Sequence, residues 1–263
     1  MSNRMSGERF NERFAGMERL VGVGSAGRIA RSHVAVIGVG GVGSWVAEAL
    51  ARSGIGALTL VDMDDVCESN FNRQIHAVES EIGRPKVEAM ARRIGQIHPE
   101  CRVTTEHRFF SASTASVILE PGFDCVVDAI DSLRNKILLI RECRSRGIPL
   151  IVSGGAGGKS DPTRVRIVDL SRTEHDPLIQ KLRKELRRKH GFPRDLRRKF
   201  GIPCVYSDEP SMAPDVCSSP EGASSLKLDC ESGYGTACFV TGAFGFAVAS
   251  WVIRILAQSP DVE

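Results

Sequence analysis

The chain has 263 residues, of which 42% are hydrophobic and 25% charged, and its formal net charge is +3. These values are ordinary for a soluble globular protein, and the length is sufficient to bury a full core without disulfides. The eight cysteines include no CxxC pair, which argues against a structural zinc site. The N-terminus has no apolar signal segment, so the scattered cysteines indicate the reducing cytoplasm.

Predicted strands and helices alternate along the first 152 residues. The predicted strands are 33–38, 57–61, 102–107, 123–128 and 149–152. The predicted helices are 8–21, a segment that runs from the turn at 38–43 to Ala51, 85–97 and 132–146, and residues 63–82 are expected to be irregular. This alternation predicts an α/β fold with a doubly wound, Rossmann-like parallel sheet that helices cover on both faces.

The pattern changes after residue 160. We expect a half-exposed strand at 163–169, a basic helix at 175–190, a mobile loop at 204–225 and an apolar helix at 236–253. The chain is therefore divided into a larger domain, 1–160, and a smaller C-terminal lobe, 161–263. The final helix is uncharged and near the minimum length of a membrane span, but Gly242 and Gly245 are typical of close packing. We expect a buried helix here, in preference to membrane contact.

A glycine-rich turn follows the first predicted strand. Gly38, Gly40, Gly41 and Gly43 give the pattern GxGxxG, directly between a strand and a helix. Such a turn lets phosphate groups approach the N-terminus of the helix, where free N–H groups and the helix dipole favour anions. Asp62 ends the second predicted strand, where its carboxylate could bind ribose hydroxyls. These residues predict a nucleotide site.

A second group of polar residues distinguishes ATP from a dinucleotide. Asn70, Arg73 and Lys86 follow the second strand, and Asp131 follows the fourth. All four are expected at the carboxyl edge of the sheet, where ligands of such folds bind. A triphosphate needs several cations during group transfer, and an acid beside phosphates is best explained by a magnesium ion. We therefore predict that residues 1–160 bind ATP and that Asp131 holds magnesium.

The segment GVGGVGSWVAEALARSGIGALTLVDMDDVCESNFNRQ resembles the adenylating domain of the ThiF, MoeB, HesA and ubiquitin-activating superfamily. The resemblance implies that the glycine turn, Asp62, Asn70, Arg73, Lys86 and Asp131 form the ATP site. It also implies a homodimer in which an N-terminal arginine, matched here by Arg13, reaches into the partner's site.

Within that superfamily the chain resembles the tRNA threonylcarbamoyladenosine dehydratases. The matching text is DAIDS, GGAGG, DPT, DPLIQKLRKELR and DCESGYGTA, which extends the likeness to nearly the whole chain. The resemblance implies ATP-dependent activation of the nucleoside's carboxylate, followed by cyclisation with net loss of water. Arg73, Lys86, Asp131 and Arg13 would then be the catalytic residues.

A strongly basic stretch agrees with an RNA substrate. Between Lys181 and Lys199 there are ten basic and two acidic residues; Phe192 lies within this stretch and Phe200 directly follows it. Clustered cations of this kind neutralise phosphates and release counterions. The expected tRNA-binding residues are Lys181, Arg183, Lys184, Arg187, Arg188, Arg197 and Arg198.

Three alternatives remain open at this stage. The first is adenylation of the C-terminus of a ubiquitin-like sulfur carrier, and the second is a nucleotide-binding scaffold in a sulfur relay with a cysteine desulfurase or sulfur acceptor. The third, an NAD oxidoreductase, is disfavoured because the cations suit a triphosphate. Cys204, Cys217 and Cys230 are left without a role, since nothing in the sequence indicates a lowered thiol pKa.

Overall fold

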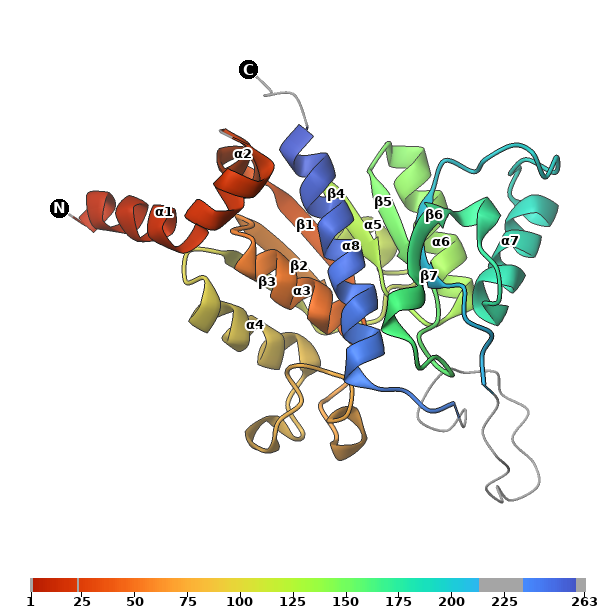
Figure 1. The fold of residues 1–263 in the computed structure, drawn as a ribbon, viewed down its shortest axis with the longest axis horizontal. Helices are drawn as coiled ribbons and strands as arrows, with labels where there is room; N and C mark the ends of the chain where they lie inside the picture. Colours follow the sequence, from red (N-terminus) through yellow and green to blue (C-terminus); the bar gives the residue numbers. More distant parts are fainter. Residues whose placement is uncertain (1, 23, 213–233, 259–263) are drawn as a thin grey trace.

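The computed structural model describes residues 2–22, 24–212 and 234–258. Its centre is a seven-stranded sheet in the order β3-β2-β1-β4-β5-β7-β6, in which all neighbours are parallel except the antiparallel pair β6 and β7 (Figure 1). The strands are β1 (His33–Ile37), β2 (Ala57–Val61), β3 (Arg102–Glu106), β4 (Cys125–Asp128), β5 (Leu150–Ser153), β6 (Val165–Asp169) and β7 (Pro203–Ser207). The prediction of an α/β fold with a largely parallel, doubly wound sheet is confirmed.

Eight α-helices occur in the described part of the chain. They are α1 (Ser2–Val21), α2 (Ser25–Arg31), α3 (Gly43–Arg52), α4 (Lys86–Ile97), α5 (Ala115–Ile118), α6 (Leu133–Arg146), α7 (Pro177–Lys189) and α8 (Cys238–Gln258). The short helices α2 and α5 were not predicted, because four to seven residues carry too little periodicity to distinguish a helix from a turn.

Helices cover both faces of the sheet and enclose two apolar layers. One layer combines β1 and β2 with the buried sides of α3, α4 and α8, including Leu50, Met90 and Phe244. The other lies beneath α5, α6 and α7 and includes Leu139 and Leu182. The central strands β1, β2, β4 and β5 are almost wholly buried, which explains their continuous apolar sequences.

Strand β7 corrects the sequence prediction. The segment from Cys204 was expected to be a mobile loop, but Pro203–Ser207 pairs with β5 on one side and with β6 on the other. Because it is enclosed on both sides, this strand lacks the alternation of a half-exposed strand, and the turn-forming residues after it resemble a loop. Residues 213–225 of the predicted loop lie outside the described residues.

Strands β6 and β7 extend the same sheet, so part of the chain after residue 160 is built onto the first five strands. The division of the chain into two units at residue 160 stays a prediction.

The apolar helix α8 is packed within the fold. It is long and apolar enough to cross a membrane by length and composition, yet 56% of its most apolar window is buried inside the protein. At Gly245 a Cβ atom would lie 2.5 Å from the Cβ of Trp45 on α3, so only glycine permits this close approach. Figure 1 shows α8 lying along α3, as expected for a core helix.

The strand order reverses between β1 and β4, and this reversal positions the site. The connection after β1 leads to one side and the connection after β4 to the other, which opens a crevice beyond their carboxyl ends. The glycine turn and the segment at Asp131 both follow these strands. They therefore meet at the topological switch point of the sheet.

Candidate functional site

The glycine turn contains two kinds of glycine. Gly38 has φ of 93°, and a Cβ there would lie 2.7 Å from the backbone oxygen of Ala129. At Gly43 a Cβ would lie 1.8 Å from the oxygen of Gly38, so the fold itself requires glycine at both positions. At Gly40, by contrast, no atom lies within 4 Å of the Cβ position. Its missing side chain leaves space for a ligand.

The N-terminus of α3 faces this space without a side-chain cap. Val42 occupies the N-cap position and makes no side-chain hydrogen bond to the first turn. Free N–H groups and the positive end of the helix dipole there favour a phosphate. A ligand with negative charge is therefore stabilised next to Gly40 and Gly41.

Asp62 links the turn to the end of β2. Its two carboxylate oxygens accept hydrogen bonds from the backbone N–H of Val39 at 2.7 Å and of Asp64 at 2.9 Å. Burial raises the pKa of Asp62, and the nearby charge of Lys86 opposes that rise. Each oxygen keeps a further lone pair, so the carboxylate can accept bonds from ribose hydroxyls.

Lys86 is buried at the first turn of α4, and its Nζ lies 2.7 Å from Oδ2 of Asp64. Only 7% of the Lys86 side chain is exposed, whereas 59% of the Asp64 side chain is. The ammonium group is thus held at the cavity wall by an exposed partner that can turn to solvent. A phosphate can then accept a bond from Lys86.

The loop after β2 supplies three further polar side chains. Asn70 is buried and its Oδ1 accepts the backbone N–H of Cys67 at 3.3 Å. Arg73 donates from Nη1 to the oxygen of Ser69 and to Oδ1 of Asn72, while its own backbone oxygen accepts from Trp45. The Oε1 atom of Gln74 is buried without a partner in the described residues.

The opposite wall comes from the segments after β4 and β5. Asp131 is exposed, and Ser153 lies at the end of β5. Below them, Lys136 and Asp128 form a fully buried ion pair with a 3.0 Å separation, and Lys136 also donates to the backbone oxygen of Ser153 at 2.8 Å. This pair joins α6 to the ends of two strands. The ion pair thereby holds together the ends of β4 and β5, next to Asp131 and Ser153.

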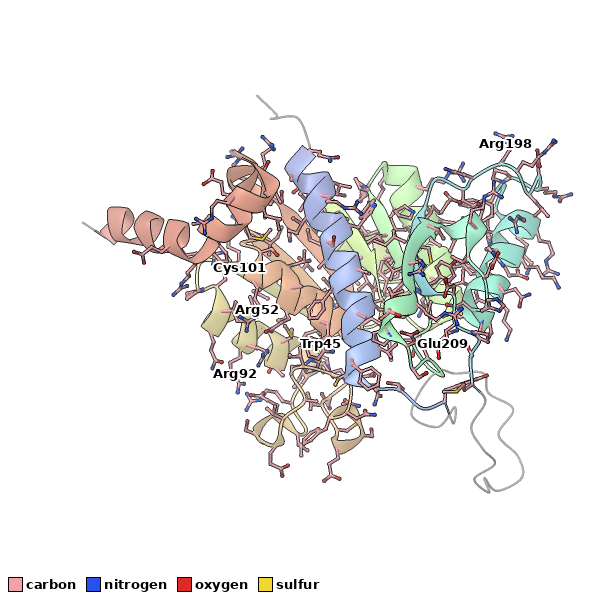
Figure 2. The ribbon with its side chains drawn as sticks, in the orientation of Figure 1. Trp45, Arg52, Arg92, Cys101, Arg198 and Glu209 are labelled. Carbon is pink, nitrogen blue, oxygen red and sulfur yellow. The ribbon has the colours of Figure 1, made fainter. Side chains whose placement is uncertain are left out.

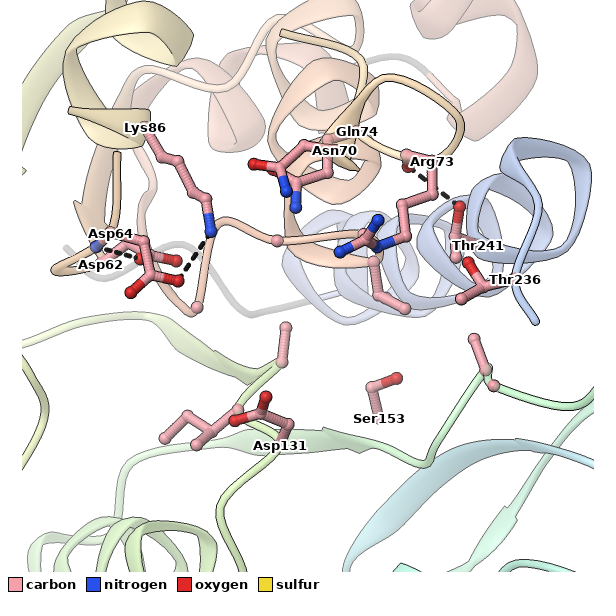
Figure 3. A pocket seen from close by; sticks show the side chains of 18 of the residues that line it. Asp62, Asp64, Asn70, Arg73, Gln74, Lys86, Asp131, Ser153, Thr236 and Thr241 are labelled. Carbon is pink, nitrogen blue, oxygen red and sulfur yellow. Dashed lines mark hydrogen bonds and ion pairs between the residues drawn. The ribbon is translucent and has the colours of Figure 1, made fainter. Parts of the chain in front are cut away.

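These walls enclose a cavity of about 840 Å³. Eight of the ten residues predicted for the nucleotide and its chemistry line it: Gly38, Gly40, Gly41, Asp62, Asn70, Arg73, Lys86 and Asp131. Figure 3 shows the side chains of Lys86, Asn70 and Arg73 on one side of the space, with Asp131 and Ser153 on the other. The structure thus brings together residues separated by more than ninety positions in the sequence.

Two predicted residues do not line the cavity. Gly43 packs against Gly38 and has a steric role in the turn. Arg13 is exposed on α1, near His98, whose pKa is lowered mainly by burial and to a lesser extent by the charge of Arg13. His98 precedes β3 at the amino edge of the sheet, so Arg13 lies at the edge opposite to the cavity of its own chain.

Sequence reasoning missed several polar cavity residues. They are Asp64, Gln74, Asn135, Ser153, Thr236 and Thr241. Asp64 could have been found from its place two residues after Asp62. Thr241 could not, because its contact with the oxygen of Arg73 joins α8 to a loop 168 residues earlier.

No group of three or more His, Cys, Asp or Glu side chains that could hold a metal ion occurs among the described residues. On the wall formed by the segments after β4 and β5, Asp131 is the carboxylate that lines the cavity among the described residues. Mg²⁺ is commonly bound by one or two carboxylates together with substrate phosphates, so this arrangement fits magnesium carried by a nucleotide.

The cysteines in the described residues do not provide an evident nucleophile near the loop predicted at 204–225. Cys204 is fully buried in β7, and burial raises the pKa of its thiol well above the usual value. Its expected place in a mobile loop is therefore wrong. Cys217 and Cys230 lie outside the described residues.

Five of the seven predicted RNA-binding residues line a second, open groove on α7, together with Gln180 and Arg194. They are Lys181, Arg183, Lys184, Arg187 and Arg188. Arg197 and Arg198 lie on the loop beyond α7 and do not line this groove. Phe192 and Phe200 pack against each other at 4.9 Å between ring centroids.

Comparisons with known proteins find matches that span nearly the full length of the chain. The model of the ThiF family matches residues 15–263. A protein of Escherichia coli named tRNA threonylcarbamoyladenosine dehydratase is 46% identical over 250 residues, which are 93% of each chain. Crystal structures of the Escherichia coli dehydratase in complex with ATP and with AMP superimpose with TM-scores of 0.84, at 44% identity over 94% of each chain.

Proposed function

This chain belongs to the ThiF family, and we propose that it is an ATP-dependent enzyme that converts threonylcarbamoyladenosine in tRNA to its cyclic, dehydrated form. The observation that carries this proposal is that one cavity of about 840 Å³ is lined by the glycine turn, the carboxylate of Asp62 and the cations Arg73 and Lys86. The relatives that match 93% and 94% of the chain carry the same activity in their names.

In this proposal ATP binds along the wall that is formed by the glycine turn, the end of β2 and the loop after β2. Asp62 binds the ribose hydroxyls, and the glycine turn with the uncapped N-terminus of α3 receives the phosphates. Arg73 and Lys86 stabilise the negative charge that develops on the phosphoryl group under attack. Asp131, on the other wall, would hold magnesium against the phosphates, where the ion would neutralise charge and orient the oxygens.

The chemistry requires activation of a carboxylate. The threonyl carboxylate oxygen attacks a phosphorus atom of ATP and forms an acyl-adenylate with release of pyrophosphate, or an acyl-phosphate with release of ADP. The carbamoyl group then attacks the acyl carbon, closes the ring and expels AMP or phosphate with the former carboxylate oxygen. The protein contributes positioning and charge neutralisation, and the nucleoside loses one water in total.

We also infer that the protein acts as a homodimer. Figure 1 shows α1 extending away from the rest of the fold, and Arg13 is exposed on it. Within its own chain Arg13 lies at the sheet edge opposite to the cavity, so a contribution to ATP chemistry requires a second copy. Light scattering should give the mass of a dimer, and Arg13→Ala should lower turnover without lowering ATP binding by the same factor.

The proposed function is tested with one substitution on each side of the cavity, at Lys86 and at Asp131. Lys86→Ala and Asp131→Ala should retain the fold, yet lose at least about 100-fold in turnover of tRNA that carries the modified nucleoside, because transition-state charge is no longer neutralised. Arg92→Ala is the matched control, since Arg92 is exposed on α4, is paired with Glu81 and lines neither the cavity nor the α7 groove. Unchanged turnover in both cavity variants would overturn the assignment.

Adenylation of a ubiquitin-like carrier is the alternative. It predicts pyrophosphate exchange that depends on such a protein and is independent of tRNA. A sulfur-relay scaffold would need an accessible thiol, and among the described residues only Cys67 and Cys238 are exposed. Both functions activate a carboxylate with ATP, and we favour the dehydratase because a relative of that name matches 93% of the chain, whereas a SAMP-activating enzyme and a molybdopterin-synthase adenylyltransferase match about half of it. A cytoplasmic location stays a prediction, as does the absence of membrane contact by α8.

A further inference from the structure

Helix α7 presents a basic face to the solvent. Its apolar residues Ile179, Leu182 and Leu186 are fully buried against the sheet, so the intervening charged side chains point outward. They form an open groove of about 820 Å³ that contains six basic residues and no acidic residue. The lining residues are Gln180, Lys181, Arg183, Lys184, Arg187, Arg188 and Arg194.

Several of these cations already have partners inside the protein. Arg183 donates to the backbone oxygen of Thr173, and Arg187 lies over the ring of Phe200 at 4.9 Å. Arg188 is paired with Glu185 at 2.6 Å. The last turn of a helix also favours cations through the helix dipole, so Arg187 and Arg188 have a structural explanation.

Lys181, Lys184 and Arg194 have no such explanation. All three are exposed, and none has a carboxylate within 4.0 Å among the ion pairs of the described residues. Lys181 and Lys184 lie one turn apart on the helix, where like charges repel each other. An anion in the groove would relieve this repulsion.

The loop that carries Arg194 is anchored. Phe192 is buried with 3% of its surface exposed, Arg144 of α6 lies over its ring at 4.6 Å, and Phe200 packs beside it. The two phenylalanines thus hold the loop against the fold, and Phe192 is not available to stack on a base. The lining of the groove therefore contains cations and no aromatic ring, which suits the backbone of a nucleic acid and not its bases.

The same helix also reaches the ATP cavity. Leu178, in its first turn, lines that cavity. Oδ1 of Asp176 accepts the backbone N–H of Ile179 at 3.0 Å, and its Oδ2 accepts the N–H of Gly155 in the cavity wall at 2.9 Å. The groove begins within one turn of Leu178 and extends to Arg188, about 15 Å further along the helix axis.

We propose that the α7 groove binds the phosphate backbone of the tRNA beside the modified nucleotide, with Lys181, Lys184 and Arg194 as its phosphate-binding residues. This inference rests on the proposed function. Because the contacts are made to phosphates, binding is independent of base sequence, and α7 sets the distance from the held backbone to the cavity. Arg197 and Arg198, which were predicted from the sequence, are outside the groove and contribute less.

The test measures binding of a fluorescently labelled tRNA transcript by anisotropy over a series of salt concentrations. Removing two phosphate contacts with Lys181→Ala/Lys184→Ala should reduce the slope of log affinity against log salt by about 1.4–1.8. The affinity at a physiological ionic strength of about 0.15 M should then fall about 15- to 30-fold. ATP binding and the melting temperature should be unchanged, since neither lysine lines the cavity or the core.

Arg52→Ala/Arg92→Ala is the matched control, because it removes the same charge from the surface of α3 and α4. Figure 2 shows Arg52 and Arg92 on the side of the molecule away from Arg198 and the α7 region. This control should keep tRNA affinity within about twofold. An equal loss in the control would overturn the proposal, since net charge alone would then account for binding.

The outcomes separate the two proposals. If the wild-type protein binds tRNA with a steep salt dependence and the groove variant retains both affinity and slope, the docking inference fails and the function stands. If the wild-type protein shows no salt-dependent tRNA binding, the proposed function itself fails. Displacement of the tRNA by polyglutamate as effectively as by unlabelled tRNA of equal charge would contradict the docking inference and indicate an acidic protein partner.

Discussion

The buried ion pair beneath the cavity allows a quantitative test of how the site is held. Lys136 and Asp128 are both 0% exposed, with Nζ and Oδ1 at 3.0 Å. In Lys136→Met the carboxylate keeps only the bond from the N–H of Ile130 at 3.0 Å, because its Oδ2 already lacks a partner in the described residues. The backbone oxygen of Ser153 also loses its donor.

Removing one member of a buried pair costs about 3–5 kcal/mol, because an uncompensated charge remains in the core. For a domain of this size that cost lowers the melting temperature by roughly 6–20 °C. It is a large part of the total stability of about 5–15 kcal/mol. We therefore expect Lys136→Met to be strongly destabilised and to lose order at Asp131 and Ser153.

The destabilisation should depend on pH with a definite sign. Burial raises the pKa of Asp128, and Lys136 is the main group that opposes the rise, so the variant's pKa is higher still. The folded variant then retains a proton that the unfolded chain has lost, and its stability falls as pH rises through that window. The difference from the wild type should thus be smaller near about pH 5 than near about pH 8.

Urea denaturation of the wild type, Lys136→Met and Asp128→Asn/Lys136→Met measures this at both pH values. The double variant should recover at least about 1 kcal/mol relative to the single variant, since the buried charge is gone. Lys189→Met, an exposed lysine on α7, should leave stability unchanged. A loss under about 1 kcal/mol for Lys136→Met, or a larger loss at the lower pH, would refute the reasoning.

Substitutions in the glycine turn and at Cys204 should separate ligand binding from stability. Gly40→Val should keep stability within about 0.5 kcal/mol but weaken ATP binding at least about tenfold by calorimetry, since no atom lies within 4 Å of its Cβ position and Gly40 lines the cavity. Gly43→Ala should instead cost stability by about 1–3 kcal/mol in thermal unfolding, because its Cβ meets the backbone of Gly38; equal stability of the two variants would contradict the distinction. Cys204→Ala should keep ATP-dependent turnover, and its loss without unfolding would show that the buried thiol takes part in the chemistry.

Much of the fold could be predicted because the parallel strands carry strong local signals. The bounds of β2 were predicted without error, and those of β1 and β3 to within one residue, since each is a short apolar or alternating run between turn residues. The strands near one edge of the sheet were harder to predict from the sequence. Strand β7 is defined by pairing with β5 and β6, over distances in sequence that no local pattern records.

The residues of the site likewise fall into those with a local sequence signal and those without one. Gly38, Asp62 and Lys86 were found because each stands at a strand end or a helix start, where the fold class places ligands. Thr241 and Ser153 carry no motif and enter the cavity through long-range packing. The basic stretch was recognised by its charge, but only the helix geometry separates Lys181 and Lys184 from paired cations such as Arg188. The structure brings most of the predicted residues to one cavity, but the roles of all of them, including Arg13 and magnesium at Asp131, stay predictions.

The central claim is that ATP activates the carboxylate of the modified nucleoside, and the fate of one oxygen atom tests it directly. The protein is incubated with ATP, magnesium and tRNA whose threonylcarbamoyladenosine carries heavy oxygen in its carboxylate, and both nucleosides and phosphates are weighed. The account predicts loss of one water from the nucleoside only when ATP is present, with one heavy oxygen recovered in AMP or in inorganic phosphate. An unchanged nucleoside mass, or dehydration with no label in either phosphate product, would contradict it.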